Sequence, residues 1–154
     1  VADAGDVVGL STTAGTLSAV TDNGDGTYTA TLTSAATVGS ATVSFTIDGD
    51  DADATASVAF VAGAADVGTS TITASPTSIT ADGTSTSTIT VTLLDANGNV
   101  VADVGDVVAL STTAGTLSGV TDNGDGTYTA ELTSPTTVGS ATVSFTIDDA
   151  DADA

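Results

Sequence analysis

The stretch Thr88-Ile89-Thr90-Val91-Thr92-Leu93 decides the fold class of this chain. Apolar side chains alternate with threonines along it, and successive side chains of an extended chain point to opposite faces. A period of two is typical of a half-buried β-strand, and β-branched Thr, Val and Ile favour strands. The stretch therefore predicts a strand that packs Ile89, Val91 and Leu93 into a core and presents threonines on its other face.

The same alternation recurs in three further segments that are separated by turn-forming residues. Their apolar positions are Val58 and Phe60, then Tyr128, Ala130 and Leu132, and finally Val143, Phe145 and Ile147. Gly-, Asn- and Asp-rich turn signals lie between the segments, and no window shows a helical apolar pattern. About seven short strands per hundred residues, separated in this way, predict an all-β chain of Ig-like β-sandwiches.

The chain also repeats itself. Residues 1–54 and 101–154 align without a gap at an offset of 100. Only eight positions of the first copy differ from their partners, namely positions 4, 9, 19, 31, 35, 36, 49 and 50. A period of about 100 residues is longer than a solenoid repeat and equals one small domain. The sequence therefore predicts tandem repeats, each an autonomous domain.

The charge of the chain excludes several classes of function. Its 154 residues include 20 acids and no Lys, Arg or His, which gives a net charge of −20. Without cations the chain has nothing to hold phosphate groups, so we expect no nucleic-acid binding and no direct membrane contact. Without His, Cys or Lys it lacks the usual general bases and nucleophiles, so we expect no enzymatic activity. A hydrophobic content of 40% separates it from disordered acidic tails.

The run from Ser78 to Val91, followed by Asp95-Ala96-Asn97-Gly98-Asn99, resembles the start of a group 1 bacterial Ig-like domain, as in invasins and intimins. Residues 110–113 and 121–128 continue the resemblance. The near-identical, Lys-free, Asp-rich copies also resemble the extender repeats of giant RTX adhesins, although the glycine-rich nonapeptides of RTX proteins are absent. The resemblance implies an extracellular module on the surface of a Gram-negative bacterium, in repeats that Ca²⁺ rigidifies.

In the frame of that family, a domain begins near Ser70. The expected parts are the later strands of one Ig-like repeat, a linker, and the next repeat without its last strand, at residues 1–66, 67–69 and 70–154. The first part lacks a counterpart of residues 72–94, and the second lacks a counterpart of residues 57–61. Because open sheet edges pair with other chains, we expect intermolecular strand pairing, or packing against neighbouring repeats, to complete the sandwiches.

Most acids fall in loops that a sandwich of alternating strands brings to one end, beside the linker. These loops span residues 95–106, 122–125 and 148–153. No Lys or Arg neutralises them, so they require a hard cation. Ligand sets made only of oxygen, on flexible loops, favour Ca²⁺ over Mg²⁺ and over transition metals.

The candidate Ca²⁺ ligands form three groups. The first has oxygen at EF-hand-like spacing, but an Asx-rich turn explains it equally well, and its members are Asp95, Asn97, Asn99, Asp103 and Asp106. The second is an acidic run, which we favour as a metal site over a solvated charge run, and it comprises Asp48, Asp50, Asp51 and Asp53 with Asp148, Asp149, Asp151 and Asp153. The third could bridge a joint between repeats and comprises Asp66 and Asp82. The turn at residues 122–126 is expected to be a hairpin device.

These inferences predict a structural extender module of a large surface adhesin, stiffened by Ca²⁺. The alternative is a Ca²⁺-dependent ligand- or carbohydrate-binding adhesive domain. Such sites use exposed aromatics, whereas the two Tyr and three Phe of this chain stand in core register. Ice binding through threonine faces and glycoside hydrolysis by two carboxylates fit less well. A halophilic structural protein would respond to NaCl as well as to Ca²⁺.

Overall fold

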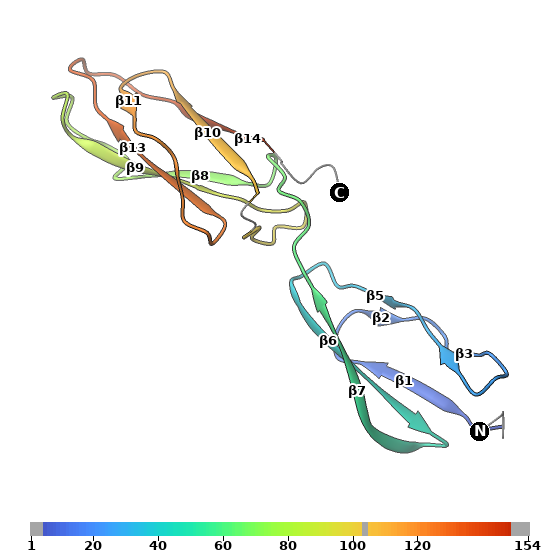
Figure 1. Cartoon of the computed structure of the whole chain (residues 1–154). Helices are drawn as coiled ribbons and strands as arrows, with labels where there is room; N and C mark the ends of the chain where they lie inside the picture. Colours follow the sequence, from blue (N-terminus) through green and yellow to red (C-terminus); the bar gives the residue numbers. More distant parts are fainter. Residues whose placement is uncertain (1–4, 103–104, 149–154) are drawn as a thin grey trace. The chain divides into compact units, whose positions relative to one another are not determined.

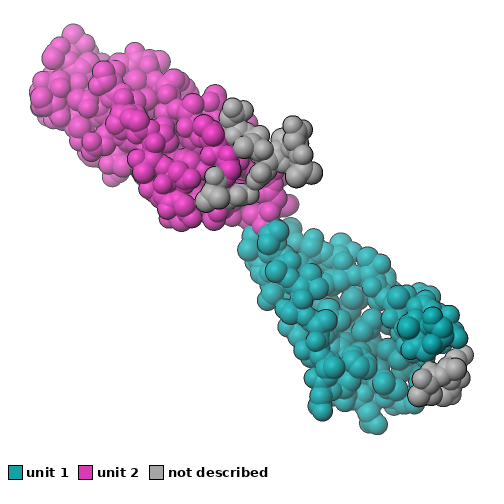
Figure 2. All heavy atoms as spheres, viewed as in Figure 1, with its two compact units in different colours: residues 1–61 teal, residues 62–154 magenta. Residues whose placement is uncertain are grey.

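The computed structural model describes residues 5–102 and 105–148, and the chain divides into two compact units (Figure 2). Unit 1 covers Val1–Val61 and unit 2 covers Ala62–Ala154. All regular elements in the described ranges are β-strands (Figure 1). The all-β fold class predicted from the alternating pattern is thus confirmed. Across these residues the structure has no helix long and apolar enough to cross a membrane.

Unit 2 consists of two antiparallel sheets. Its strands are β8 (Thr71–Ser75), β9 (Thr86–Thr92), β10 (Val107–Thr112), β11 (Thr116–Leu117), β12 (Thr121–Asp122), β13 (Thr127–Thr133) and β14 (Val143–Asp148). One sheet has the order β11-β13-β9-β8, with β12 also paired to β13, and the other joins β10 to β14. The central pair is β13 and β9, in which Tyr128 lies opposite Val91.

The core of unit 2 lies on the faces that the sequence predicts. Val91 and Leu93 are fully buried and Ile89 is 1% exposed, whereas Thr88 is exposed. Tyr128 of β13 joins Val91 and Leu93 in the same cluster, and side chains of β10 and β14 pack against it from the second sheet. Both sheets therefore contribute to one apolar layer, as in a sandwich.

Unit 1 repeats the strands that follow β9 in unit 2, has no counterpart of β8 and β9 among the described residues, and adds one long final strand. Its strands are β1 (Val8–Thr12), β2 (Thr16–Leu17), β3 (Thr21–Asp22), β4 (Tyr28–Thr29), β5 (Leu32–Thr33), β6 (Gly39–Ile47) and β7 (Asp50–Phe60). They form a sheet β1-β6-β7 and two small ladders, β2-β5 and β3-β4. Asp48 and Gly49 both have positive φ and connect β6 to β7 in a two-residue hairpin turn, for which Asp-Gly is a favoured pair.

Segments of nearly identical sequence form strands of different length in the two units. Residues 127–133 make one continuous strand in unit 2, because β9 pairs with the segment along its whole length. Residues 27–33 differ only at position 31, yet they form the separate two-residue strands β4 and β5, and no strand equivalent to β9 pairs with them among the described residues. The neighbouring strand, rather than the local sequence, thus sets strand length here.

Residues 62–69, which contain the expected linker at 67–69, lie within unit 2. Ala65 forms a β-bridge with Asp95, and the backbone N–H of Asp66 donates to the carbonyl oxygen of Leu94 at 2.8 Å. Ala62 and Ala65 pack against the core cluster of this unit. The boundary between the units therefore falls at Val61 and Ala62.

Candidate functional site

The carboxylate of Asp95 follows β9 and is surrounded by N–H donors. Its Oδ1 accepts hydrogen bonds from the backbone N–H groups of Asn97 and Asn99, each at 2.9 Å. Its Oδ2 accepts from the side-chain amide of Asn99 at 2.9 Å and from the backbone N–H of Gly63 at 3.0 Å. Asp95 is only 3% exposed. The first member of the predicted EF-hand-like set therefore has four donors on two oxygens.

These donors keep Asp95 ionised. The side-chain amide of Asn99 contributes most, followed by the N–H of Gly63, and together they hold the pKa of Asp95 well below its ordinary value. A cation at the same oxygens would lie against N–H groups whose positive ends point at the carboxylate. Asp95 thus has the bonds of a structural anchor that ties residues 62–69 to the turn after β9, and calcium ligation would require losing them.

Asp106, the last member of that set, is buried, and Asp103 lies outside the described residues. The backbone carbonyl of Asp106 accepts a hydrogen bond from the hydroxyl of Tyr128 at 3.1 Å. Unit 1 repeats this contact, since the hydroxyl of Tyr28 donates to the carbonyl of Asp6 at 3.2 Å. In each unit a tyrosine thus fixes the chain just before β1 or β10.

Asp82 fastens two turns of unit 2 together. Its Oδ1 accepts from the backbone N–H groups of Thr84 at 2.8 Å and Ser85 at 2.7 Å, and its Oδ2 accepts from the Ser85 hydroxyl at 2.8 Å. The hydroxyl of Ser134, from the loop after β13, donates to Oδ1 at 3.2 Å. The N–H of Ser85, ahead of that of Thr84, holds the pKa of Asp82 well below its ordinary value. As with Asp95, donors within its own unit occupy this carboxylate.

Asp66, the other predicted bridging residue, is half-buried in unit 2. Its Oδ1 accepts from the backbone N–H of Gly68 at 2.7 Å, which closes a tight turn. Its own carbonyl accepts from the N–H of Ser70 at 2.9 Å. These local bonds shape the entry into β8.

The acidic run of the first copy surrounds the β6–β7 turn. Asp48 accepts a hydrogen bond from the N–H of Val7 through Oδ1 at 2.9 Å. Asp50, Asp51 and Asp53 are exposed on β7. In the second copy Asp148 ends β14, and Asp149, Asp151 and Asp153 lie outside the described residues. Over residues 5–102 and 105–148, no group of three acidic side chains converges closely enough to hold a metal ion.

The Asp-Asn-Gly-Asp-Gly turn is held by its own acids, as expected of a hairpin device. Oδ1 of Asp122 accepts from the N–H of Gly124 at 2.8 Å, and Oδ1 of Asp125 accepts from the N–H and the hydroxyl of Thr127. The side-chain hydrogen bond from Thr127, more than the backbone one, lowers the pKa of Asp125. The first copy repeats the same bonds at residues 22–27.

The sequence does not reveal the partners of these carboxylates. Gly63 is 32 residues from Asp95, and Ser134 is 52 residues from Asp82. A turn signal shows only that an acid can bond to the next few N–H groups. Nothing local in the sequence identifies a distant donor. For this reason Asp95 and Asp82 were predicted to need a cation.

A protein-family model described as "Invasin, domain 3" matches residues 1–63 and 66–154. The chain belongs to the invasin domain 3 family. Each unit of the chain is thus an invasin-type repeat, or most of one, and the resemblance to invasins is confirmed.

Solved structures of bacterial adhesins support this assignment. Invasin, described as a bacterial integrin-binding protein, is 35% identical with a TM-score of 0.67, and the alignment covers 94% of this chain and 30% of invasin. FdeC, an Escherichia coli adhesin, is 32% identical with a TM-score of 0.67 over 96% of this chain and 49% of FdeC. InvD of Yersinia pseudotuberculosis is 32% identical with a TM-score of 0.64 over 97% of this chain and 44% of InvD.

These invasin-type relatives confirm the Ig-like β-sandwich and are adhesin domains rather than enzymes, which is consistent with an extracellular location. The comparison with curated proteins found no match. The chain spans less than half the length of each of these three solved relatives. The activities of those whole proteins therefore do not transfer to this chain directly.

Proposed function

We propose that this chain is a spacer from a large surface adhesin of a Gram-negative bacterium, similar in role to an RTX extender region. The observation that supports the proposal is the repeat: 54 residues recur at an offset of 100 with eight differences, in a family of adhesin Ig-like domains. Near-identical domains in series add length with each copy. A spacer needs stable, soluble units and no binding surface of its own.

The aromatic side chains support a spacer over a ligand-binding module. All five are buried or half-buried, and they are Tyr28, Phe45, Phe60, Tyr128 and Phe145. Protein- and sugar-binding surfaces rely on exposed Tyr and Trp, and protein interfaces also on Arg. This chain has no Trp and no Arg. The surface therefore offers few of the side chains that dominate binding energy.

The net charge fits the same role. With −20 charges and no cation, separate copies of the chain repel one another, which opposes lateral association and favours solubility. The repulsion also opposes compaction of each unit. Repulsion between copies is useful to a spacer on a crowded cell surface. Repulsion within a unit destabilises the fold and has to be offset.

We propose that Ca²⁺ offsets this repulsion by binding to the acidic run around the β6–β7 turn, rather than to Asp95 or Asp82. The exposed carboxylates of Asp50, Asp51 and Asp53 offer the hard oxygen ligands that Ca²⁺ prefers. Because they do not converge on one point among the described residues, water or acids of a neighbouring repeat would complete the coordination. Asp95 and Asp82 are already bonded to N–H and O–H donors. A bound divalent cation would supply the positive charge that the sequence lacks.

Immobilised integrin, the ligand class of invasin, distinguishes the two candidate functions, and a glycan panel with and without Ca²⁺ serves as the second surface. A spacer gives no more signal on these surfaces than on a blank surface without integrin or glycan. Saturable Ca²⁺-dependent binding to either surface would establish the adhesive domain instead.

A further inference from the structure

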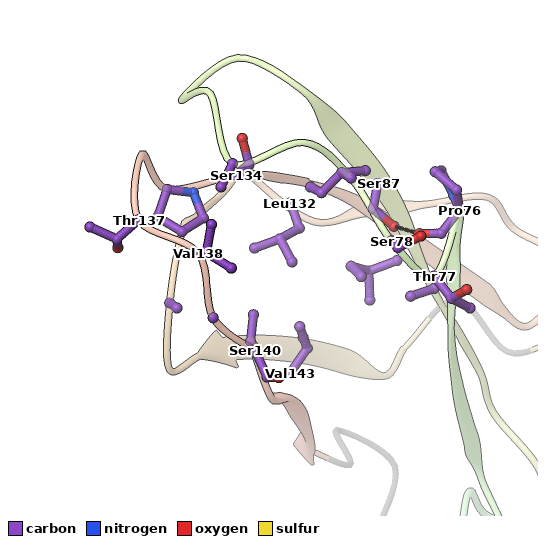
Figure 3. A pocket seen from close by; sticks show the side chains of 18 residues that line it. Pro76, Thr77, Ser78, Ser87, Leu132, Ser134, Thr137, Val138, Ser140 and Val143 are labelled. Carbon is purple, nitrogen blue, oxygen red and sulfur yellow. Dashed lines mark hydrogen bonds between the residues drawn. The ribbon is translucent and has the colours of Figure 1, made fainter.

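The turns of this chain contain three Asn-Gly pairs, which begin at Asn23, Asn97 and Asn123. Such a pair is prone to deamidation, because the glycine has no side chain to hinder attack by its own backbone nitrogen. The cavity of ≈510 Å³ beside Leu132 and Val143 offers no such group, since it is lined only by apolar residues, glycine, serine and threonine (Figure 3). The amides that can react therefore lie in the turns.

Deamidation requires two groups of one turn to meet. The backbone nitrogen of the glycine attacks Cγ of the asparagine and closes a succinimide ring, while the bond from Cγ to the side-chain nitrogen breaks. That nitrogen takes up the proton of the glycine N–H and leaves as ammonia. Water then opens the ring at either carbonyl, which gives aspartate or isoaspartate. An asparagine amide that is hydrogen-bonded elsewhere reacts more slowly, because that bond has to break first.

In both copies of the Asp-Asn-Gly-Asp-Gly turn the asparagine amide is held. Nδ2 of Asn23 donates to the hydroxyl oxygen of Thr27, and Nδ2 of Asn123 donates to that of Thr127, each at 2.9 Å. The backbone N–H of each asparagine also donates to the carbonyl oxygen of the same threonine, at 3.0 Å. Two bonds to one residue thus fix each of these asparagines.

The side chain of Asn97 lacks this restraint. It is exposed, and it has no hydrogen bond to any residue in the described ranges 5–102 and 105–148. The N–H of Gly98 donates to the carbonyl oxygen of Asp95 at 2.9 Å. The attacking N–H is also bonded in the other two pairs, by Asp22 and Asp122. The freedom of the asparagine amide is therefore the difference between the three sites.

We propose that Asn97 is the first site of spontaneous deamidation in this chain, with water as co-reactant, and that the product loosens the hold of Asp95 on residues 62–69. Isoaspartate adds a methylene to the backbone between the N–H groups of Asn97 and Asn99, which both donate to Oδ1 of Asp95. The new carboxylate also repels that of Asp95. The inference does not depend on the spacer function, since it concerns one turn of unit 2.

NMR of the isotope-labelled 154-residue chain follows each asparagine separately. During incubation at mildly alkaline pH, the loss of each side-chain NH₂ signal gives a deamidation rate. We expect Asn97 to react about fivefold faster than Asn23 and Asn123, the factor that corresponds to one hydrogen bond of about 1 kcal/mol. In urea that unfolds the chain, this difference should disappear. Equal rates in the folded chain, or the same ratio of rates in urea, would overturn the proposal.

Thr127→Val tests the cause of the difference. It removes the hydroxyl that holds Asn123 and keeps a β-branched side chain at the start of β13. The rate at Asn123 should rise toward that at Asn97, while Asn23 keeps its rate because Thr27 still holds it. Thr27→Val repeats the test in unit 1, with Asn123 as the control. Unchanged rates at both freed asparagines would show that these bonds give no protection.

Amide exchange at Gly63 tests the effect on the anchor. The N–H of Gly63 donates to Oδ2 of Asp95 at 3.0 Å. It should lose protection in chains that have converted at Asn97. Asn97→Asp, which adds the charge without the extra methylene, should cause a smaller loss. Equal protection of Gly63 in fresh and converted chains would refute the loosening of residues 62–69.

Discussion

Individual carboxylates in this chain are stabilised by donors of the chain itself, because it has no Lys, Arg or His. Asp95 and Asp82 accept several N–H and O–H hydrogen bonds each, and these bonds join segments that are far apart in the sequence. Charge-assisted hydrogen bonds of this kind are stronger than neutral ones. Two acids that contribute to the repulsive net charge are therefore also stabilising elements of unit 2.

The first prediction concerns Asp95→Asn. The amide of the variant has nearly the same shape, but one oxygen becomes an NH₂ group that faces the N–H of Gly63 or the amide of Asn99. We expect a lower melting temperature for unit 2 and faster amide exchange across residues 62–69, which Asp95 holds. The matched control is Asp122→Asn in an exposed turn, where one N–H is accepted. Equal effects of the two variants would show that Asp95 is no anchor.

The second prediction concerns pH. The pKa of folded Asp95 is held below the ordinary value of 3.8, so its contribution to stability is fully present above that pH. The contribution is lost as the pH falls from there through the folded-state pKa. Urea denaturation of the native chain and of Asp95→Asn should therefore give a constant difference in unfolding free energy between neutral pH and about pH 4, and a shrinking difference below it. A difference that falls already between pH 7 and pH 5 would contradict this assignment.

The third prediction compares two tyrosines at equivalent positions of the two copies. Tyr128 and Tyr28 make the same hydrogen bond to a backbone carbonyl, but Tyr128 is buried and Tyr28 is half-buried. Tyr128→Phe should lower the unfolding free energy of unit 2 by about 1 kcal/mol, since a buried acceptor loses its donor. Tyr28→Phe should cost unit 1 less, because water replaces the lost donor. A larger loss for Tyr28→Phe in denaturant titrations would refute the reasoning.

Among the strands, the sequence predicted well which face of a strand is buried, and it predicted strand length poorly. The alternation at residues 88–93 identified the buried face of β9, because burial of alternate side chains follows from the pleat alone. The lengths of β13 and of its first-copy equivalent were not predictable, since the two segments differ at one position and only their partners differ. Whether a segment forms a strand depends on the segment and on its pairing partner, and the sequence of the segment alone says nothing about the partner.

At the candidate sites, too, local hydrogen bonds were predictable from the sequence and long-range ones were not. The turn at residues 122–126 was predicted, because its bonds span two or four residues. The roles of Asp95 and Asp82 were not, since their bonds to Gly63 and Ser134 exist only after distant strands have paired. The structure shows Asp95 and Asp82 as hydrogen-bond acceptors for distant segments, which their position in loops does not reveal.

At the scale of the whole molecule, the net charge of −20 leads to the fourth prediction. If Ca²⁺ binds the acidic run, its binding to the folded state adds RT ln(1 + [L]/Kd), about 2.7 kcal/mol at a hundredfold excess over Kd. The melting temperature should rise more in millimolar Ca²⁺ than in NaCl of equal ionic strength. Joint replacement of Asp50, Asp51 and Asp53 by Asn should remove most of that excess, and Asp82→Asn should leave it.

Equal shifts in Ca²⁺ and NaCl would contradict the calcium part of the proposal. They would indicate that screening of the net charge alone stabilises the chain, as in a halophilic protein. An excess effect of Ca²⁺ that disappears in Asp82→Asn would place the ion at that turn instead of at the acidic run.

Small-angle X-ray scattering is the best test of whether invasin-type repeats of this sequence act as spacers. Polypeptides of one, two, three and four complete repeats are measured in Ca²⁺ and in EDTA. If the repeats are spacers, the maximum dimension in Ca²⁺ grows by the same increment with each added repeat of about 100 residues. Growth with roughly the square root of the repeat number, as for flexibly joined units, or no growth at all, would contradict it.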